Sequence, residues 1–246
     1  MYLTKFPLNL TRRSTVALLS SPYKLHAAIA GSFPSGEASA DAGRVLWRVD
    51  REPDGPATLY VVSPERPSLV GLDEQAGWPD LEHQWVTRDY DPFLEKIADG
   101  QVYQFRLVAN TVVNRSAVAG QAGRSKRLPH VTALQRASWL VGSAAYEEVG
   151  RKVPEYLVRQ DESRAERSGF KVLPDEDSGM LKLVVSDLHE YDIRQRKKGN
   201  RIKLSTTRYD GVLEVTDAVK LKHALTHGIG HGKGFGCGLL TLALVR

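Results

Sequence analysis

The sequence predicts an α+β protein in which the order β-α-β-β-α-β occurs twice along the chain. Segments with the two-residue alternation of strands are interleaved with segments of helical character. Asp91-Pro92 and Asp99-Gly100 mark a boundary between two such series. The 246 residues, of which 41% are hydrophobic, are sufficient for one large domain or two small ones with apolar cores.

The first series begins with Tyr2 to Leu8, where apolar and polar side chains alternate as in a strand. Ser21 and Pro22 then fit the N-cap and first position of a helix. The sequence predicts a turn at Pro53, Asp54 and Gly55 between two later strands. The expected elements are strands at 2–8, 45–49, 58–62 and 83–87 and helices at 22–29 and 69–75.

The second series is interpreted as the same order, with one of its four strands not assigned to residues. Its expected elements are strands at 102–108, 212–215 and 239–245 and helices at 132–148 and from Asp217 onward. Such an order is that of the ferredoxin-like fold, so the sequence predicts two ferredoxin-like (RRM-like) domains in tandem. The expected N-terminal domain comprises residues 1–95 and the C-terminal domain residues 100–246.

A glycine-rich loop precedes the last strand. A backbone without Cβ atoms can adopt positive φ and turn its N–H groups toward a phosphate, and a lysine adds positive charge. The spacing and the order helix, loop, strand do not match a nucleotide-binding P-loop. The loop residues expected to contact a phosphate or nucleic acid are Gly228, Gly230, Gly232, Lys233, Gly234, Gly236 and Gly238.

The positive charge is concentrated in the C-terminal part of the chain. The formal net charge is +5 and the pI is near 9.3. Residues 1–98 contain 10 Lys and Arg against 13 Asp and Glu, whereas residues 99–246 contain 24 against 16. This asymmetry indicates a polyanionic partner for the C-terminal part.

A basic hairpin is expected around the turn Gly199-Asn200. Its cations repel one another, and no acidic residues lie between them to relieve the repulsion. This favours a hairpin that binds the sugar-phosphate backbone of a duplex over one that only faces solvent. The hairpin residues are Arg194, Arg196, Lys197, Lys198, Arg201 and Lys203. A further basic cluster consists of Arg124, Lys126 and Arg127.

The helix that starts at Pro22 carries the candidate catalytic pair. Tyr23 and His26 are three residues apart and share one face of its opening turn. Beside a phosphate, these groups can exchange the protons that RNA cleavage requires, one at the ribose 2′-hydroxyl and one at the departing 5′-oxygen. Which residue is acid and which is base stays open, and the alternative is that His26 only caps or packs.

Several segments together resemble the CasE family, the endoribonucleases that process CRISPR precursor RNA in type I-E Cascade complexes. The resemblance extends over nearly the whole chain in the expected order. It is carried by Met1 to Lys5, Pro22 to His26, Phe105 to Asn110, Trp139-Leu140, Asp210 to Ala218 and Gly228 to Leu240.

The resemblance implies two ferredoxin-like domains that bind the CRISPR repeat stem-loop and cut at its 3′ base. It implies cleavage without metal or other cofactor, leaving a 2′,3′-cyclic phosphate and a 5′-hydroxyl, and retention of the product as a Cascade subunit. The family's catalytic tyrosine and histidine fall on Tyr23 and His26. Its glycine-rich loop falls on Gly228 to Gly238, and its groove-inserting hairpin falls on Arg194 to Lys203 by position and charge.

Three positions depart from the family pattern. Val108 and Thr111 stand where many relatives have a basic residue and a proline, and Ala27 stands where some have a basic residue. The cations that could compensate are Lys24, Arg12 and Arg13.

Other functions are also compatible with parts of the sequence. His223, His227 and His231 recur every four residues, which permits a metal site, but no cysteine or acidic ligand accompanies them. Tyr103 and Phe105 share a strand face and could stack bases or pack in the core. A non-catalytic RNA-binding subunit with the same fold remains the alternative to an enzyme.

The sequence also indicates where the protein acts. Its single cysteine, Cys237, excludes an internal disulfide, and it more readily fills an apolar gap than acts as a nucleophile. There is neither a signal-peptide pattern nor an apolar run long enough to span a bilayer. We therefore expect a cytoplasmic protein without membrane or small-molecule partners.

Overall fold

The computed structural model of the chain describes residues 1–34, 43–51, 56–79, 85–115, 126–158, 161–194 and 201–245. The chain forms two compact units. One comprises Met1–Ile97, Ile193–Arg201 and Lys222–Leu239, and the other Ala98–Asp192, Ile202–Leu221 and Leu240–Arg246. The glycine-rich loop thus belongs to the first unit, although it follows the second series of elements in the sequence. The domain boundaries of 1–95 and 100–246 remain a prediction.

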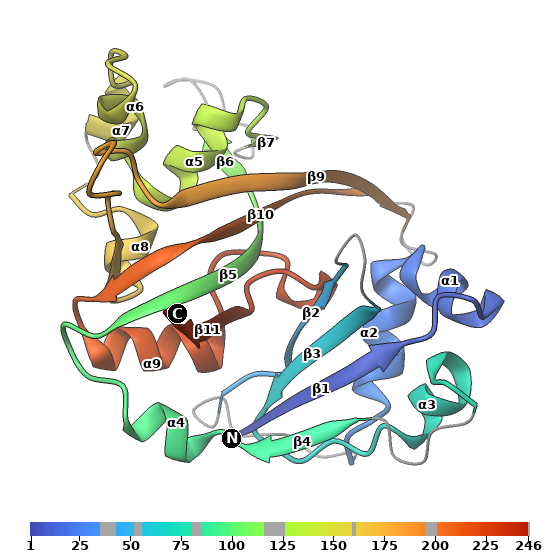
Figure 1. Ribbon diagram of the computed structural model, residues 1–246. Coiled ribbons are helices and arrows are strands. Elements are labelled where there is room, and N and C mark those ends of the chain that lie inside the picture. The colour runs from blue at the N-terminus through green and yellow to red at the C-terminus, as the bar shows by residue number, and fades with distance from the viewer. Residues whose placement is uncertain are drawn as a thin grey trace. The chain divides into compact units, whose positions relative to one another are not determined.

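The first unit is a ferredoxin-like fold, as expected. Its four-stranded sheet is antiparallel and has the strand order β2-β3-β1-β4 (Figure 1). A short helix, α4 (Asp91–Glu95), follows the last strand. The elements are β1 (Tyr2–Leu8), α1 (Arg13–Leu19), α2 (Pro22–Ala30), β2 (Leu46–Asp50), β3 (Ala57–Ser63), α3 (Val70–Ala76) and β4 (Val86–Asp89).

The core of this unit lies between the sheet and its helices. On β1, Thr4, Phe6 and Leu8 alternate inward as a strand with one buried face requires. Leu25 and Ile29 of α2 are four residues apart and pack into the same cluster. The helix α1 was not expected from the sequence. Its N-cap residue is Arg12, whose side chain makes no capping hydrogen bond, so the sequence shows no capping residue at the start of this helix.

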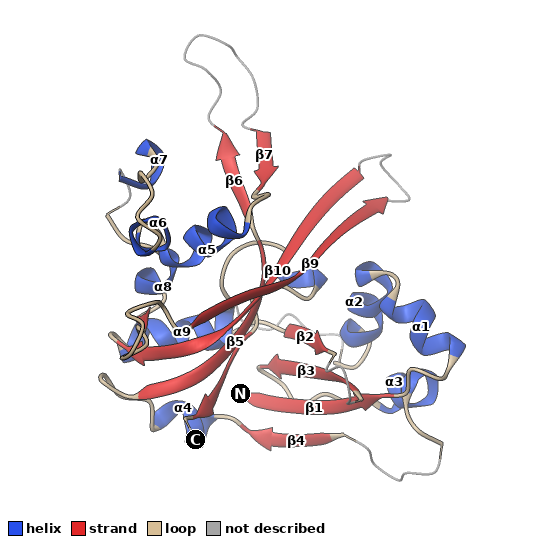
Figure 2. Ribbon diagram, turned by 45° about the horizontal axis from the view of Figure 1, so that its top comes forward, coloured by secondary structure: helices blue, strands red, loops and turns tan. Residues whose placement is uncertain are grey.

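The second unit has the same topology with additions. Its sheet has the order β11-β5-β10-β8. The strand β9 pairs with β10 (Figure 2). A separate hairpin consists of β6 and β7. The strands are β5 (Val102–Asn110), β6 (Val112–Arg115), β7 (Lys126–Pro129), β8 (Phe170–Val172), β9 (Leu183–Arg194), β10 (Arg201–Val215) and β11 (Leu240–Leu244).

The helices of the second unit are short. None of the helices in the described ranges combines the length and apolar character needed to cross a bilayer. They are α5 (Ala133–Val141), α6 (Ala144–Glu148), α7 (Glu155–Val158) and α8 (Arg164–Arg167). The helix α9 (Ala218–His227) begins in the second unit, and its residues from Lys222 onward belong to the first.

One expectation for the second unit is wrong, and of the two alternatives left open for Tyr103 and Phe105 the structure supports packing in the core. The single helix expected at 132–148 is divided into α5 and α6, because Gly142 has φ 66° and ends the first of them. Tyr103 and Phe105 are only 6% and 4% exposed, and the Phe105 ring lies 5.7 Å from that of Phe170, measured between centroids. Both aromatic residues therefore pack in the core and are not available for stacking bases.

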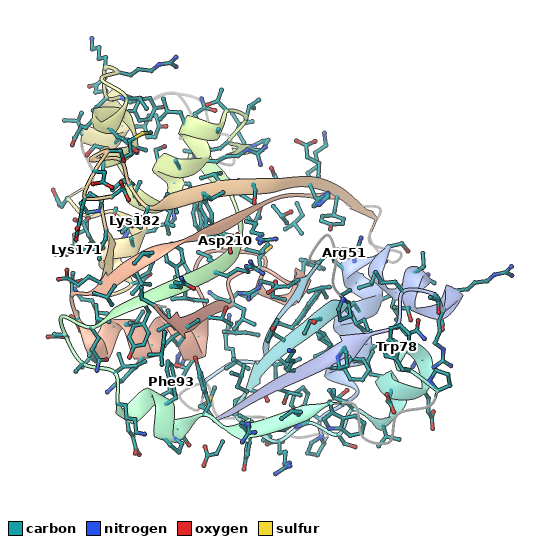
Figure 3. The ribbon with its side chains drawn as sticks, viewed as in Figure 1. Arg51, Trp78, Phe93, Lys171, Lys182 and Asp210 are labelled. Carbon is teal, nitrogen blue, oxygen red and sulfur yellow. The ribbon has the colours of Figure 1, made fainter. Side chains whose placement is uncertain are left out.

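The surface of the second sheet carries an ion-pair network. Asp210, labelled in Figure 3, lies on β10 and accepts hydrogen bonds from Nε of Arg106 on β5 and Nε of Arg208. Lys171 on β8, also labelled, pairs with Glu214 on β10 at 3.0 Å. The pairs Arg106–Asp210 and Lys171–Glu214 join neighbouring strands, as opposite charges on facing positions of a sheet do, whereas Arg208 and Asp210 both lie on β10.

The second unit contains a buried histidine whose titration should affect stability. His130 is 6% exposed, and burial together with the charges of Arg164 and Arg136 lowers its pKa to about 4. The unfolded chain takes up a proton near pH 6.5, whereas the folded chain resists protonation until about pH 4. The stability that results from the lowered pKa of His130 is therefore fully present above pH 6.5 and is lost as the pH falls toward 4.

We expect His130→Gln to reduce the acid sensitivity of folding. Between pH 7.5 and pH 5, the loss in free energy of unfolding should be smaller in the variant than in the wild type by about 1–2 kcal/mol. Urea unfolding at the two pH values measures this difference. Equal losses in both proteins would show that His130 is not the group responsible.

Candidate active site

The start of α2 presents the predicted catalytic pair to solvent. Ser21 caps the helix, with its Oγ accepting a hydrogen bond from the Lys24 backbone N–H at 3.4 Å, and Pro22 occupies the first turn. The apolar side of the helix is anchored in the core, so its opposite side faces outward. Tyr23 is 59% exposed and His26 is also exposed. The predicted helix start is confirmed.

The glycine-rich loop follows α9 in an extended series of turns. The N–H of Gly228 donates to the Ala224 carbonyl at 2.9 Å, which ends the helix. A short 3-10 turn, η2 (Lys233–Phe235), lies in the middle of the loop, and the N–H of Ile229 donates to the Gly238 carbonyl at 2.9 Å across its base. The glycines with positive φ are Gly228, Gly230, Gly232, Gly236 and Gly238.

Close packing on β2 explains two of these glycines. A Cβ placed on Gly236, where φ is 82°, would lie 2.6 Å from Cζ3 of Trp47. A Cβ on Gly228 would lie 2.8 Å from Cδ2 of Leu46. Real Cβ atoms essentially never come this close, so a Cβ at Gly236 would have to displace the Trp47 ring and one at Gly228 the Leu46 methyl group. The absence of a Cβ at both positions lets the loop rest closely on the strand. The sequence analysis assigned all six glycines to ligand contact and missed this packing role.

Gly234 brings the loop to the catalytic helix. A Cβ placed on Gly234 would be 3.6 Å from Cε1 and 3.7 Å from Nε2 of the His26 ring. Both residues belong to the first unit. The exposed imidazole at the helix start and the glycine-rich backbone, which the sequence indicates separately, therefore lie next to one another.

Lys233 occupies an internal position in the loop. Its Nζ donates a hydrogen bond to the Gly230 carbonyl at 2.9 Å, and its Cγ and Cε lie next to Gly238 and Gly228, respectively. Burial, with a smaller contribution from the charge of Arg44, lowers its pKa. The side chain thus links both ends of the loop, a role that the sequence analysis did not assign. Its contact with phosphate remains a prediction.

The other predicted RNA-binding residues lie on several elements. Lys24 on α2 and Lys203 on β10 are exposed. Lys126 and Arg127 belong to β7, Arg194 to β9 and Arg201 to β10. The strands on both sides of the expected basic hairpin are present, and its turn lies outside the described residues, as do Arg124, Arg196, Lys197 and Lys198.

The structure does not favour the other chemistries considered. The rings of His223 and His227 stack with centroids 4.0 Å apart, and His227 Nδ1 lies 2.9 Å from the Thr226 hydroxyl. Within the described residues, no three His, Cys, Asp or Glu side chains are grouped as metal ligands. Cys237 is fully buried, and burial raises the pKa of its thiol to about 12, which disfavours the nucleophilic thiolate.

Sequence reasoning also missed the residues that support the loop. Trp47 lies against Gly236, and Arg48 donates a hydrogen bond from Nη1 to the carbonyl of Leu239 at 2.9 Å. Arg48 and Asp50 form a buried ion pair within β2. The sequence signal for this ion pair was two opposite charges, two residues apart, in an otherwise apolar strand. Charges buried in such a strand have to be paired, so Arg48 and Asp50 could have been expected to bind one another.

The fold and the site together define a tandem ferredoxin-like protein in which a glycine-rich loop contacts a histidine at a helix start. A family model described as CRISPR associated protein matches residues 1–243. The chain belongs to this family. The resemblance derived from the sequence is thereby confirmed.

Solved structures share the fold over the whole chain. A CRISPR endoribonuclease Cse3 bound to a 19-nucleotide RNA is 23% identical, with a TM-score of 0.68 over 99% of this chain and 100% of that one. Thermus thermophilus Cse3, bound to an RNA representing a pre-cleavage complex, is 24% identical, with a TM-score of 0.67 over 98% of each chain.

A third structure is a chain of a CRISPR RNA-guided surveillance complex described as pre-nicking. It is 26% identical, and the TM-score is 0.59 over the full length of both chains. No curated protein sequence matches the chain.

Proposed function

We propose that this protein is an endoribonuclease that binds the stem-loop of a CRISPR repeat and cleaves precursor RNA at the 3′ base of the stem. It then keeps the product as a subunit of a Cascade complex in the cytoplasm. The observation that carries the proposal is the His26 ring facing Gly234 in a glycine-rich loop. Family membership and the fold shared with RNA-bound Cse3 support the choice of substrate.

The proposed reaction is a transesterification within the RNA. The ribose 2′-oxygen attacks the adjacent phosphorus while the bond from phosphorus to the 5′-oxygen breaks, leaving a 2′,3′-cyclic phosphate and a 5′-hydroxyl. One proton leaves the 2′-hydroxyl and one is delivered to the 5′-oxygen. Both transfers need groups within hydrogen-bond reach of the scissile linkage, and His26 and Tyr23 are the candidates.

The surroundings of His26 suit an anionic transition state. The N-terminus of α2 and the backbone N–H groups of a glycine-rich loop both favour negative charge. Hydrogen bonds from such preorganised donors to the non-bridging oxygens would stabilise the charge that develops during attack. The loop then holds the phosphate, while the side chains of α2 exchange protons with the 2′-hydroxyl and the departing 5′-oxygen.

Cleavage in the presence of EDTA tests the proposal against a non-catalytic RNA-binding subunit. We expect the purified protein to cut a radiolabelled repeat hairpin in chelator and to leave a cyclic phosphate end, because proton transfer by side chains requires no metal. Bound but intact RNA would favour the binding subunit. Cleavage that requires added divalent metal would contradict the mechanism.

The basic hairpin should contribute affinity rather than rate. Replacing Lys197 and Lys198 together by alanine removes two phosphate contacts, so we expect RNA affinity to fall and the slope of log K against log salt to become shallower by about 1–2 units. Fluorescence anisotropy at several salt concentrations measures both. As a matched control, Lys171→Ala and Lys182→Ala remove two lysines outside the proposed site. Unchanged affinity in the hairpin variant would show that the hairpin does not bind RNA.

A further inference from the structure

The strand β2 supports the glycine-rich loop along three consecutive residues. Leu46 contacts Gly228, and Trp47 contacts Gly236. Arg48 reaches the chain directly after the last glycine, where its Nη1 donates to the Leu239 carbonyl at 2.9 Å. The strand therefore contacts the loop near its beginning, near its last turn and at its end.

Arg48 is held rigidly at this place. Its side chain is almost completely buried, and it binds the Asp50 carboxylate in a bidentate manner, with Nε and Nη2 at 2.6 Å and 3.0 Å from the two oxygens. The guanidinium carbon also lies 5.7 Å from the centre of the Tyr60 ring. A planar guanidinium bound in this way has little freedom left, so the position of Nη1 is defined.

A loop that contains so many glycines needs a contact that fixes its position. Six glycines occur between Gly228 and Gly238, and glycine has more conformational freedom to lose than any other residue. The end of α9 fixes the beginning of the loop through the hydrogen bond from Gly228 to Ala224. The hydrogen bond from Arg48 fixes the other end.

We propose that Arg48, held by Asp50, is a positioning residue that fixes the end of the glycine-rich loop and thereby sets Gly234 against the His26 ring. This inference rests on the proposed function. Arg48 acts on the reaction through the loop, because a displaced loop would present the phosphate in the wrong place relative to the imidazole. Displacements of about 1 Å in such a site lower rates by about 100-fold.

The test compares three variants with the wild type. Arg48→Met removes the hydrogen bond but deprives the buried Asp50 carboxylate of its Arg48 ion pair, which can prevent folding. The double variant Arg48→Met with Asp50→Leu removes both charges and keeps apolar volume. Arg164→Met is the matched control, because Arg164 also donates to a carbonyl, that of Trp139 at 2.8 Å, and lies over an aromatic ring.

In the double variant we expect the single-turnover rate constant to fall by about 10- to 100-fold, with Kd for a 2′-deoxy, uncleavable hairpin within about threefold of the wild type. Hydrogen exchange of residues 228–239 should become faster. The Arg164→Met variant should show neither change. A merely stabilising pair would not separate rate from affinity in this way.

Two results would overturn the inference. One is a folded double variant that cleaves at the wild-type rate, and the other is unchanged hydrogen exchange in the loop. If the wild type does not cleave the hairpin, the proposed function fails, and the exchange data still decide whether Arg48 fixes the loop.

Discussion

Replacing His26 by alanine is expected to lower the single-turnover rate constant of cleavage by about 10²- to 10⁴-fold, the usual contribution of a positioned acid or base. The Kd for the repeat hairpin should stay nearly unchanged. The side chain is exposed and the helix is held by Leu25 and Ile29, so its removal should not disturb the fold. Cleavage of labelled hairpin in EDTA and anisotropy with uncleavable RNA measure the two quantities.

His223→Ala provides the matched control for this experiment. His223 is another exposed histidine of the first unit, and it lies on α9, where its ring stacks on that of His227. Its replacement should leave the rate unchanged. If the His26 variant keeps more than about a tenth of the wild-type rate, His26 is not a principal proton-transfer group. If the His223 variant loses activity in the absence of chelator, the histidines of α9 have a role that we have not assigned.

Gly236→Ala is expected to destabilise the protein by about 2–4 kcal/mol and to reduce cleavage strongly. Left-handed backbone costs an alanine about 1–2 kcal/mol, and a methyl group forced against a buried ring adds about 1–3 kcal/mol. Here φ is 82° and the added Cβ would lie 2.6 Å from the Trp47 ring. Urea unfolding measures the stability, and the hairpin assay measures the activity.

Gly234→Ala is the corresponding control within the same loop. Its Cβ would lie 3.6 Å from the nearest atom of the His26 ring, an ordinary contact, and φ at this position is not among the positive values of the loop. We expect stability close to that of the wild type, with cleavage reduced because the methyl group takes space beside the imidazole. Equal stability of the Gly236 and Gly234 variants would contradict the packing that we describe.

The architecture could be predicted because its signals are local. The alternation of Thr4, Phe6 and Leu8 and the cap formed by Ser21 and Pro22 act within a few residues. Breaks of regular structure were harder to predict. Gly142 ends α5 through its own backbone conformation, and the preceding apolar pattern continues past it.

The sequence predicted which residues form the site, but not the contacts that hold the glycine-rich loop in place. Residue type and spacing identified His26 and the glycines, because an imidazole at a helix start and a backbone without side chains have recognisable chemistry. The contacts from Arg48 to Leu239 and from Lys233 to Gly230 depend on tertiary packing and on one loop conformation. No pattern along the chain encodes them.

The most direct test of the account is a crystal structure of the wild-type protein with a repeat hairpin that carries a 2′-deoxy nucleotide at the cleavage site. We predict that a ring nitrogen of His26 lies within hydrogen-bond reach, about 3 Å, of the 2′ position or the 5′-oxygen, with the phosphate against the backbone of residues 232–236. A cleavage site bound away from α2, with the His26 ring in contact with protein alone, would contradict the account.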